Sequence, residues 1–175
     1  MANSRIDIKR KEENLEIVIN AFYDAQKQKM LLVWIVLFSL CGLAIVSQFF
    51  EDYEQSYKVF FGVYVAFWLF FEFKVIYAYR WRKHGKEIIV INKEEFVLTK
   101  NIGSRGVTQT IKIKDIKKID FFNQQNKGFI SSMNNSYWNI NKYQLALFLT
   151  NNTIPFGIDL SNIEAKNILN LIKKM

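Results

Sequence analysis

The sequence predicts a membrane α-helical hairpin followed by an α+β, mainly β domain of about six antiparallel strands and a C-terminal helix. Two apolar runs carry the helical part: Leu31–Phe50 and Val59–Tyr79 lie eight residues apart in a chain of 175 residues. A third observation predicts the β domain and its terminal helix: short β-type segments follow Gly85, and an amphipathic segment closes the chain. We therefore expect three parts, residues 1–29, a hairpin over 30–82 and a domain over 83–175.

The first apolar run is long enough to cross a bilayer. It holds no charged residue in twenty positions, and at about 1.5 Å per residue such a helix matches a hydrocarbon core about 30 Å thick. It is longer than the apolar part of a cleaved signal peptide, and no small-residue cleavage site follows Phe50. We expect a retained span, paired with the aromatic-rich second run.

Charged residues around the hairpin predict its orientation. Lys and Arg precede the first run and follow the second, whereas the linker Glu51–Lys58 has three acids and one Lys. Because Lys and Arg favour the cytoplasmic side, both termini are expected in the cytoplasm and the linker outside. This distribution also accounts for the formal net charge of +8 without a nucleic-acid partner.

The segment before the hairpin is periodic. Its apolar residues recur at helical spacing, at Leu15, Val18, Ile19, Phe22 and Ala25. We predict an amphipathic helix over Glu12–Lys29. Its apolar stripe is expected either along the inner membrane surface or against the soluble domain, and the pattern favours neither.

Alternating segments after Gly85 predict an antiparallel sheet. The expected strands are Glu87–Ile91, Phe96–Lys100, Val107–Lys114, Ile116–Phe122, Tyr143–Thr150 and Thr153–Ile158. Within Val107–Lys114 the alternation places Val107, Gln109, Ile111 and Ile113 on one mainly apolar face. Residues 123–141 are rich in Asn, Gln, Ser and Gly and are expected to form a long loop.

The chain closes with a helix signal. Ser161-x-x-Glu164 has the pattern of a capping box, and an apolar stripe follows it at helical spacing. This order of elements resembles a pleckstrin-homology-like (PH-like) domain, and Thr110–Ile119 is similar to the strand, turn and strand of bacterial members. The whole chain is similar in layout to small bacterial two-span membrane proteins with a C-terminal PH-like domain. The resemblance implies an interaction module in the bacterial inner membrane.

One carboxylate lies inside the second span. Glu72 falls close to Ser39 when the two spans are aligned antiparallel, so the Ser39 hydroxyl is expected to hydrogen-bond it. Glu72 is either a functional intramembrane group or a structural one in the inner leaflet, with Lys74 reaching the headgroups. Gly62-x-x-x-Ala66 is a small-residue pair that predicts close packing against the first span.

Two further sets of residues are candidates for contacts outside the chain. The basic residues Arg80, Arg82, Lys83 and Lys86, with His84 among them, follow the second span and either bind anionic headgroups or only set the topology. The long loop carries apolar side chains that either contact a partner or fold back on the core, at Phe129, Ile130, Tyr137 and Trp138.

No motif in the chain predicts catalysis. There is no glycine-rich phosphate loop, no Gly-x-Ser-x-Gly and no HExxH, and the single His84 and single Cys41 exclude a site built from several such ligands. We expect no enzyme, cofactor, metal or nucleic acid; the expected partners are membrane lipids and a protein partner or second copy. The alternatives are an immunity-type protein against a membrane-acting toxin and an accessory subunit of a membrane enzyme or transporter.

Overall fold

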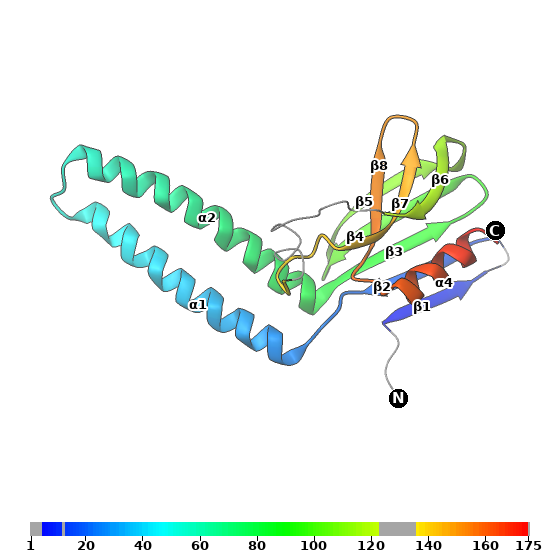
Figure 1. The fold of residues 1–175 in the computed structure, drawn as a ribbon, viewed down its shortest axis with the longest axis horizontal. Coiled ribbons are helices and arrows are strands. Elements are labelled where there is room, and N and C mark those ends of the chain that lie inside the picture. The colour runs from blue at the N-terminus through cyan, green and yellow to red at the C-terminus, as the bar shows by residue number, and fades with distance from the viewer. Residues whose placement is uncertain (1–4, 12, 123–135, 175) are drawn as a thin grey trace. The chain divides into compact units, whose positions relative to one another are not determined.

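The computed structural model describes residues 5–11, 13–122 and 136–174, and the chain divides into two compact units. The helical unit is Tyr23–Arg80. The β unit combines Met1–Phe22 with Trp81–Met175, so it is built from both ends of the chain. Figure 1 shows the elements of each unit.

The predicted helical hairpin is present in the helical unit. Helix α1 (Ala25–Ser47) leads through a short 3₁₀ turn, η1 (Gln48–Phe50), to helix α2 (Gln55–His84). The two helices lie side by side in Figure 1. At the end of the hairpin opposite its loop, Gln28 Nε2 donates a hydrogen bond to the Tyr79 carbonyl at 3.0 Å. Both are long and apolar enough to cross a membrane.

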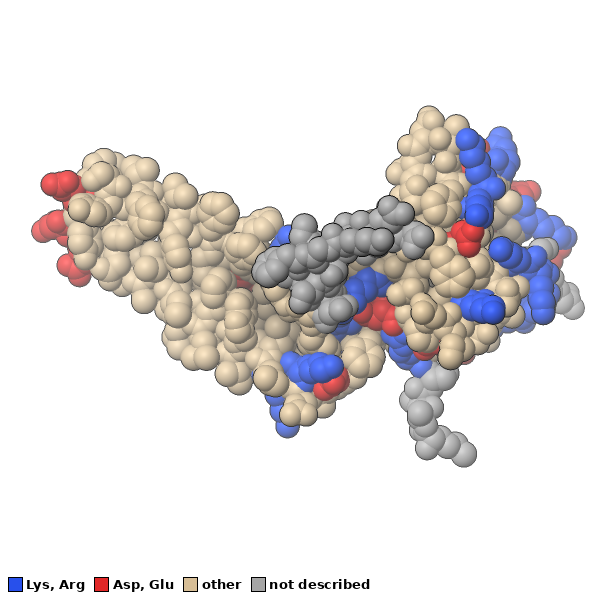
Figure 2. Space-filling view, viewed as in Figure 1, with Lys and Arg blue, Asp and Glu red and all other residues tan. Residues whose placement is uncertain are grey.

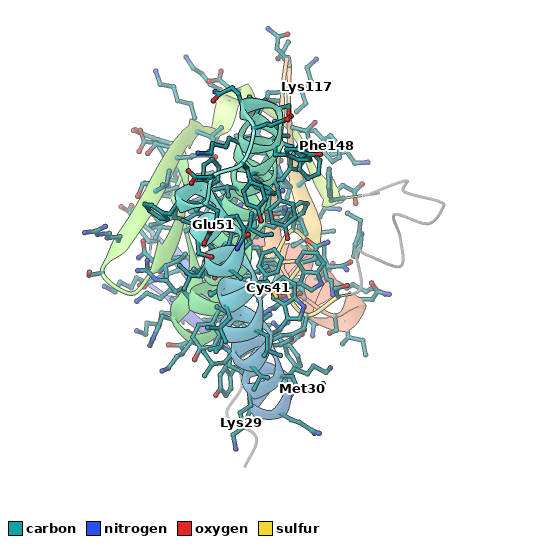
Figure 3. All side chains as sticks on the ribbon, turned by 90° about the vertical axis from the view of Figure 1, so that its left-hand side faces the viewer. Lys29, Met30, Cys41, Glu51, Lys117 and Phe148 are labelled. Atoms are coloured by element: carbon teal, nitrogen blue, oxygen red, sulfur yellow. The ribbon has the colours of Figure 1, made fainter. Side chains whose placement is uncertain are left out.

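The outer surface of the helical unit is apolar. Figure 2 shows acidic side chains at the loop end and a largely uncharged face along the helices. Figure 3 labels Glu51 in that loop, and Cys41 and then Met30 follow along α1 toward the beginning of the helix. Many large apolar side chains of both helices are exposed, as a lipid-facing surface requires.

The β unit contains two antiparallel sheets. The larger has the order β1 (Ile6–Arg10), β2 (Leu15–Asn20), β3 (Gly85–Ile91), β4 (Glu95–Ile102) and β5 (Arg105–Lys112). After the 3₁₀ turn η2 (Ile113–Asp115), the smaller has the order β6 (Ile116–Phe121), β7 (Tyr143–Leu149) and β8 (Thr153–Ile158). All six strands predicted after Gly85 are confirmed.

The predicted helix over Glu12–Lys29 is wrong. Strand β2 occupies Leu15–Asn20, and α1 begins only at Ala25. Leu15, Ile17 and Ile19 alternate with outward residues and are almost completely buried. The apolar residues of this segment fit a helical period and a strand period equally. The strand forms because pairing with the distant β3 satisfies the backbone N–H and carbonyl groups of β2 and buries one of its faces.

The helical unit is therefore inserted between two neighbouring strands of one sheet. Asn20, the last residue of β2, pairs with Lys86 near the start of β3. The next backbone N–H, of Ala21, donates to the Gly85 carbonyl at 2.9 Å. The chain thus leaves and re-enters the β unit at the same end of two paired strands.

A single core fills the space between the two sheets and the last helix, α4 (Asn162–Ile172). The predicted capping box is confirmed: Ser161 Oγ accepts the Glu164 N–H, and Glu164 Oε2 accepts the Ser161 N–H. The buried face of α4 consists of Ala165, Ile168, Leu169 and Ile172. Arg5, just before β1, forms an ion pair with Glu164, with 3.0 Å between Arg5 Nη2 and Glu164 Oε2. This ion pair fixes the start of α4 beside β1.

Candidate functional site

The intramembrane pair predicted from the sequence forms in the helical unit. Ser39 Oγ donates to Glu72 Oε1 at 2.6 Å, and Glu72 is 7% exposed. Its second oxygen, Oε2, is buried without a hydrogen-bond partner among the described residues. Lys74 is not part of this pair: it is exposed, with its Nζ over the Phe70 ring at 4.5 Å.

The small residue that brings the helices together is not the predicted one. A Cβ at Gly62 would meet no atom within 4 Å, and Ala66 is exposed, so this pair does not pack on α1. The close approach occurs at Gly42 of α1, where a Cβ would lie 1.9 Å from Trp68 Cε2. The Trp68 ring fills that space and donates its Nε1–H to the Phe38 carbonyl at 3.0 Å. Two antiparallel helices present many alternative registers, and the bulk of Trp68 selects this one.

The basic run after the second span divides into two kinds of residue. Arg80, Lys83 and His84 are exposed and Lys86 is half-buried, so these side chains are accessible to headgroups. Arg82 is different. It is 2% exposed and forms an ion pair with Asp159, so the prediction that it belongs to a membrane-surface group is wrong.

Arg82 organises a junction inside the β unit. Its guanidinium donates to the carbonyls of Tyr137 at 2.9 Å and Asn139 at 3.1 Å, and it lies over the Tyr137 ring. Arg is suited to this position because its planar donors satisfy several acceptors at once. Tyr137 thus folds back on the β unit, whereas Trp138 is partly exposed. Phe129 and Ile130, predicted as partner contacts, lie outside the described residues.

A buried carboxylate that was not among the predicted site residues lies between the two sheets. Glu87 of β3 is 0% exposed, and its Oε2 accepts the N–H groups of Gly157 at 2.9 Å and Ile158 at 2.8 Å. The positive φ of Gly157, 75°, turns these consecutive N–H groups toward one oxygen. The signal was present in the strand pattern, because Gly85, Glu87, Ile89 and Ile91 alternate on the buried face of β3.

Lys100 of β4 completes this inter-sheet cluster. Its Nζ lies 3.7 Å from Glu87 Oε1 and donates to Tyr143 Oη at 3.1 Å. Burial raises the pKa of Glu87, while Lys100 and the two backbone N–H groups oppose that rise. With every neighbour drawn from strands of the β unit, the cluster ties the sheets together.

The part of the chain that is described contains no group of three or more His, Cys, Asp or Glu side chains placed to hold a metal ion. The two charged clusters, Arg82–Asp159 and Glu87–Lys100, are committed to backbone and side-chain partners inside the β unit.

The fold therefore defines the protein as a two-helix hairpin inserted in a two-sheet β unit. Comparison with protein-family models and with curated proteins finds no match to this sequence.

Proposed function

We propose that this chain is a non-enzymatic, two-span protein of a bacterial cytoplasmic membrane, whose PH-like β unit faces the cytoplasm and binds a protein partner there. The observation that carries the proposal is the insertion of the hairpin between β2 and β3. Paired strands belong to one compartment, so a hairpin between them must cross the membrane and return. A β unit built in this way is held at the membrane by two chain connections.

The charge of the two units supports this orientation. The helical unit has as many acidic as basic residues, and its acids gather in the loop that joins the helices. Residues 81–175 hold 15 Lys and Arg against 7 Asp and Glu. Basic segments beside a span stay on the cytoplasmic side, and a basic domain there attracts anionic headgroups and acidic partners.

Topology is tested with two matched serine-to-cysteine variants of the full chain, Ser56→Cys in the hairpin loop and Ser104→Cys in the β4–β5 turn. Both positions are exposed. The background is Cys41→Ser, which removes the single native thiol. An impermeant maleimide added to intact spheroplasts should label Ser56→Cys and leave Ser104→Cys unlabelled until the membrane is opened. Labelling of both in intact cells, or the opposite pattern, contradicts the proposal.

The binding role is tested by lysine-reactive crosslinking of intact membranes that contain the full chain. We expect a discrete heteromeric species, identified by mass spectrometry. Recovery of the chain alone, or only with copies of itself, contradicts partner binding.

A further inference from the structure

We propose that the outer edge of β5 docks an extended, acidic segment of a partner protein, which adds to the larger sheet as one more strand. This inference rests on the proposed function, because it specifies how the partner is bound. Three observations support it: the exposure of β5, the protection of every other described edge, and the charges at the two ends of β5.

The backbone of β5 offers unpaired donors and acceptors along one side. Among the described strands β5 pairs only with β4. The Ile113 N–H donates to the Glu94 carbonyl at 2.8 Å, one step beyond the Glu95–Lys112 pair. Because hydrogen-bonded residues alternate in an antiparallel ladder, odd-numbered residues of β5 bond to β4 and even-numbered ones face outward. The outward groups are those of Gly106, Thr108, Thr110 and Lys112.

The side chains of β5 are equally open. The sequence pattern predicts an apolar, buried face over Val107, Gln109, Ile111 and Ile113, but only Ile111 is buried within the strand. Val107 is 68% exposed. The core ends at Ile111, and the first six residues of β5 are all exposed. A strand laid beside β5 would cover Val107 as well as the edge.

The other described edges each carry a device that blocks strand addition. In β1, three of five residues are charged: Asp7, Lys9 and Arg10. In β6, the register with β7 shifts between Ile116 and Lys118, and Lys117 and Lys118 are exposed; Lys117 is marked in Figure 3. Charges and irregular register are the means by which soluble sheets avoid pairing with other chains.

The edge of β8 is occupied from within. Pro155 removes a donor, and the N–H groups of Gly157 and Ile158 are taken by Glu87. β5 has no register shift and no proline, and its two charged residues stand at its ends. Its register with β4 is continuous over eight pairs.

The charged residues at the ends of β5 indicate that the added strand is acidic. Arg105 and Lys112 stand at the two ends of β5, seven positions apart, and the exposed Lys114 follows. Two copies of β5 paired antiparallel about their centre would set Arg105 opposite Lys112 at both ends, which is unfavourable. A partner segment with acids seven positions apart places a carboxylate opposite each cation instead. Segments added to a sheet edge gain affinity from the backbone and specificity from such side-chain pairs.

The test uses the full chain in mild detergent at low salt and two blocked octapeptides carrying a neutral dye. One peptide has Glu at its first and eighth positions with alternating Val and Thr between them; the other has Lys at both ends. Fluorescence anisotropy should show the Glu-ended peptide binding at least about tenfold more tightly than the Lys-ended peptide. The first peptide forms two favourable charge pairs with the ends of β5, and the second forms two unfavourable ones. Equal affinity for the two peptides, or no binding of either, overturns the inference.

Matched variants locate the site. Thr108→Pro removes one outward N–H and leaves the bonds to β4 in place, whereas Thr108→Val keeps that N–H and loses only the hydroxyl contact to Thr99. We expect Thr108→Pro to weaken binding of the Glu-ended peptide about tenfold, and Thr108→Val to bind as the native chain does. Equal affinity in all three proteins overturns the inference.

A charge-reversal variant guards against a folding defect in Thr108→Pro. Arg105→Glu combined with Lys112→Glu should reverse the preference, so that the Lys-ended peptide binds more tightly. Retention of the native preference in this variant contradicts docking at β5. If the native chain forms a dimer and Thr108→Pro does not, the occupant of the edge is a second copy of this chain instead. The peptide assay uses purified protein, so its failure overturns strand addition alone, while the membrane crosslinking decides separately whether a partner exists.

Discussion

Glu87 and Gly157 belong to different sheets, and the Glu87 carboxylate accepts the Gly157 N–H at 2.9 Å. The same oxygen accepts the Ile158 N–H, so one side chain of β3 replaces the neighbouring strand that β8 lacks on this side. We expect Glu87→Ala to destabilise the β unit by about 2–4 kcal/mol, because two buried N–H groups and a cavity are left behind. Thermal unfolding of the full chain in detergent measures this.

Glu87→Gln is the matched control, because its amide oxygen still accepts both N–H groups. The pKa of Glu87 is raised by burial, so the ionised form weakens the native state, and native stability falls as the pH rises from 4.5 through that raised value. Relative to the native chain, Glu87→Gln should therefore gain stability as the pH increases above 4.5. A native-minus-variant difference that is the same at pH 4 and pH 9 would contradict this assignment.

The Arg5–Glu164 ion pair predicts the opposite response to acid. Burial works against ionisation of Glu164, but hydrogen bonds from Arg5 and Ser161 outweigh it and lower its pKa from 4.5 to about 2. The pair's stabilisation is complete above pH 4.5 and is lost as the pH falls toward 2. Because Glu164 is partly exposed, we expect a loss of only about 1–2 kcal/mol.

Acid unfolding of the full chain, followed by circular dichroism, checks this dependence. Glu164→Gln retains an oxygen for the Ser161 N–H and lacks a titrating group, so its stability should not change between pH 4.5 and pH 2 on this account. If the native chain and Glu164→Gln lose stability in parallel over that interval, the ion pair is not the cause.

Gly42 and Gly62 provide a matched pair in the hairpin. Gly42→Ala places a methyl group 1.9 Å from Trp68 Cε2, so the helices must separate or shift, at a cost of about 1–3 kcal/mol. Gly62→Ala meets nothing within 4 Å and gains helix propensity, so it should be neutral or stabilising. Unfolding in detergent mixtures with increasing denaturing detergent compares the two, and equal stability of both variants would contradict the observed helix register.

Ser39 and Glu72 are expected to stabilise the same interface. Ser39→Ala removes the one hydrogen bond that the described structure gives to the Glu72 carboxylate and should destabilise the hairpin by about 0.5–2 kcal/mol. Combining it with Glu72→Gln should cost less than the sum of the two single changes. Strict additivity in this double-mutant cycle would show that the contact contributes nothing.

Local pattern was sufficient for much of the fold. The strands after Gly85, the capping box at Ser161 and the two long helices are confirmed because each is specified by residues close in sequence. The Ser39–Glu72 contact followed from one antiparallel alignment. The strand at Leu15–Asn20 escaped prediction because its conformation is decided by β3, across the whole hairpin.

Other errors have a similar physical origin. Arg82 has the same side chain as its basic neighbour Arg80, and only the packing of distant residues around Asp159 makes it a buried residue. Gly62 and Gly42 are both small residues in long apolar helices, and the position of Trp68 decides which one is needed. The exposure of Val107 reflects where the core ends, which alternation within β5 does not reveal.

The pairing of β2 with β3 also orders the synthesis of the protein. A ribosome completes β1 and β2 before either helix exists, and β2 then waits for a partner about seventy residues further along the chain. A chain in which only one helix had entered the bilayer would hold β2 and β3 on opposite sides and leave Ile17 and Ile89 without a core. If the two helices span a bilayer as proposed, completion of the sheet would report correct insertion, and a chain inserted wrongly would expose unpaired strands to cellular proteases.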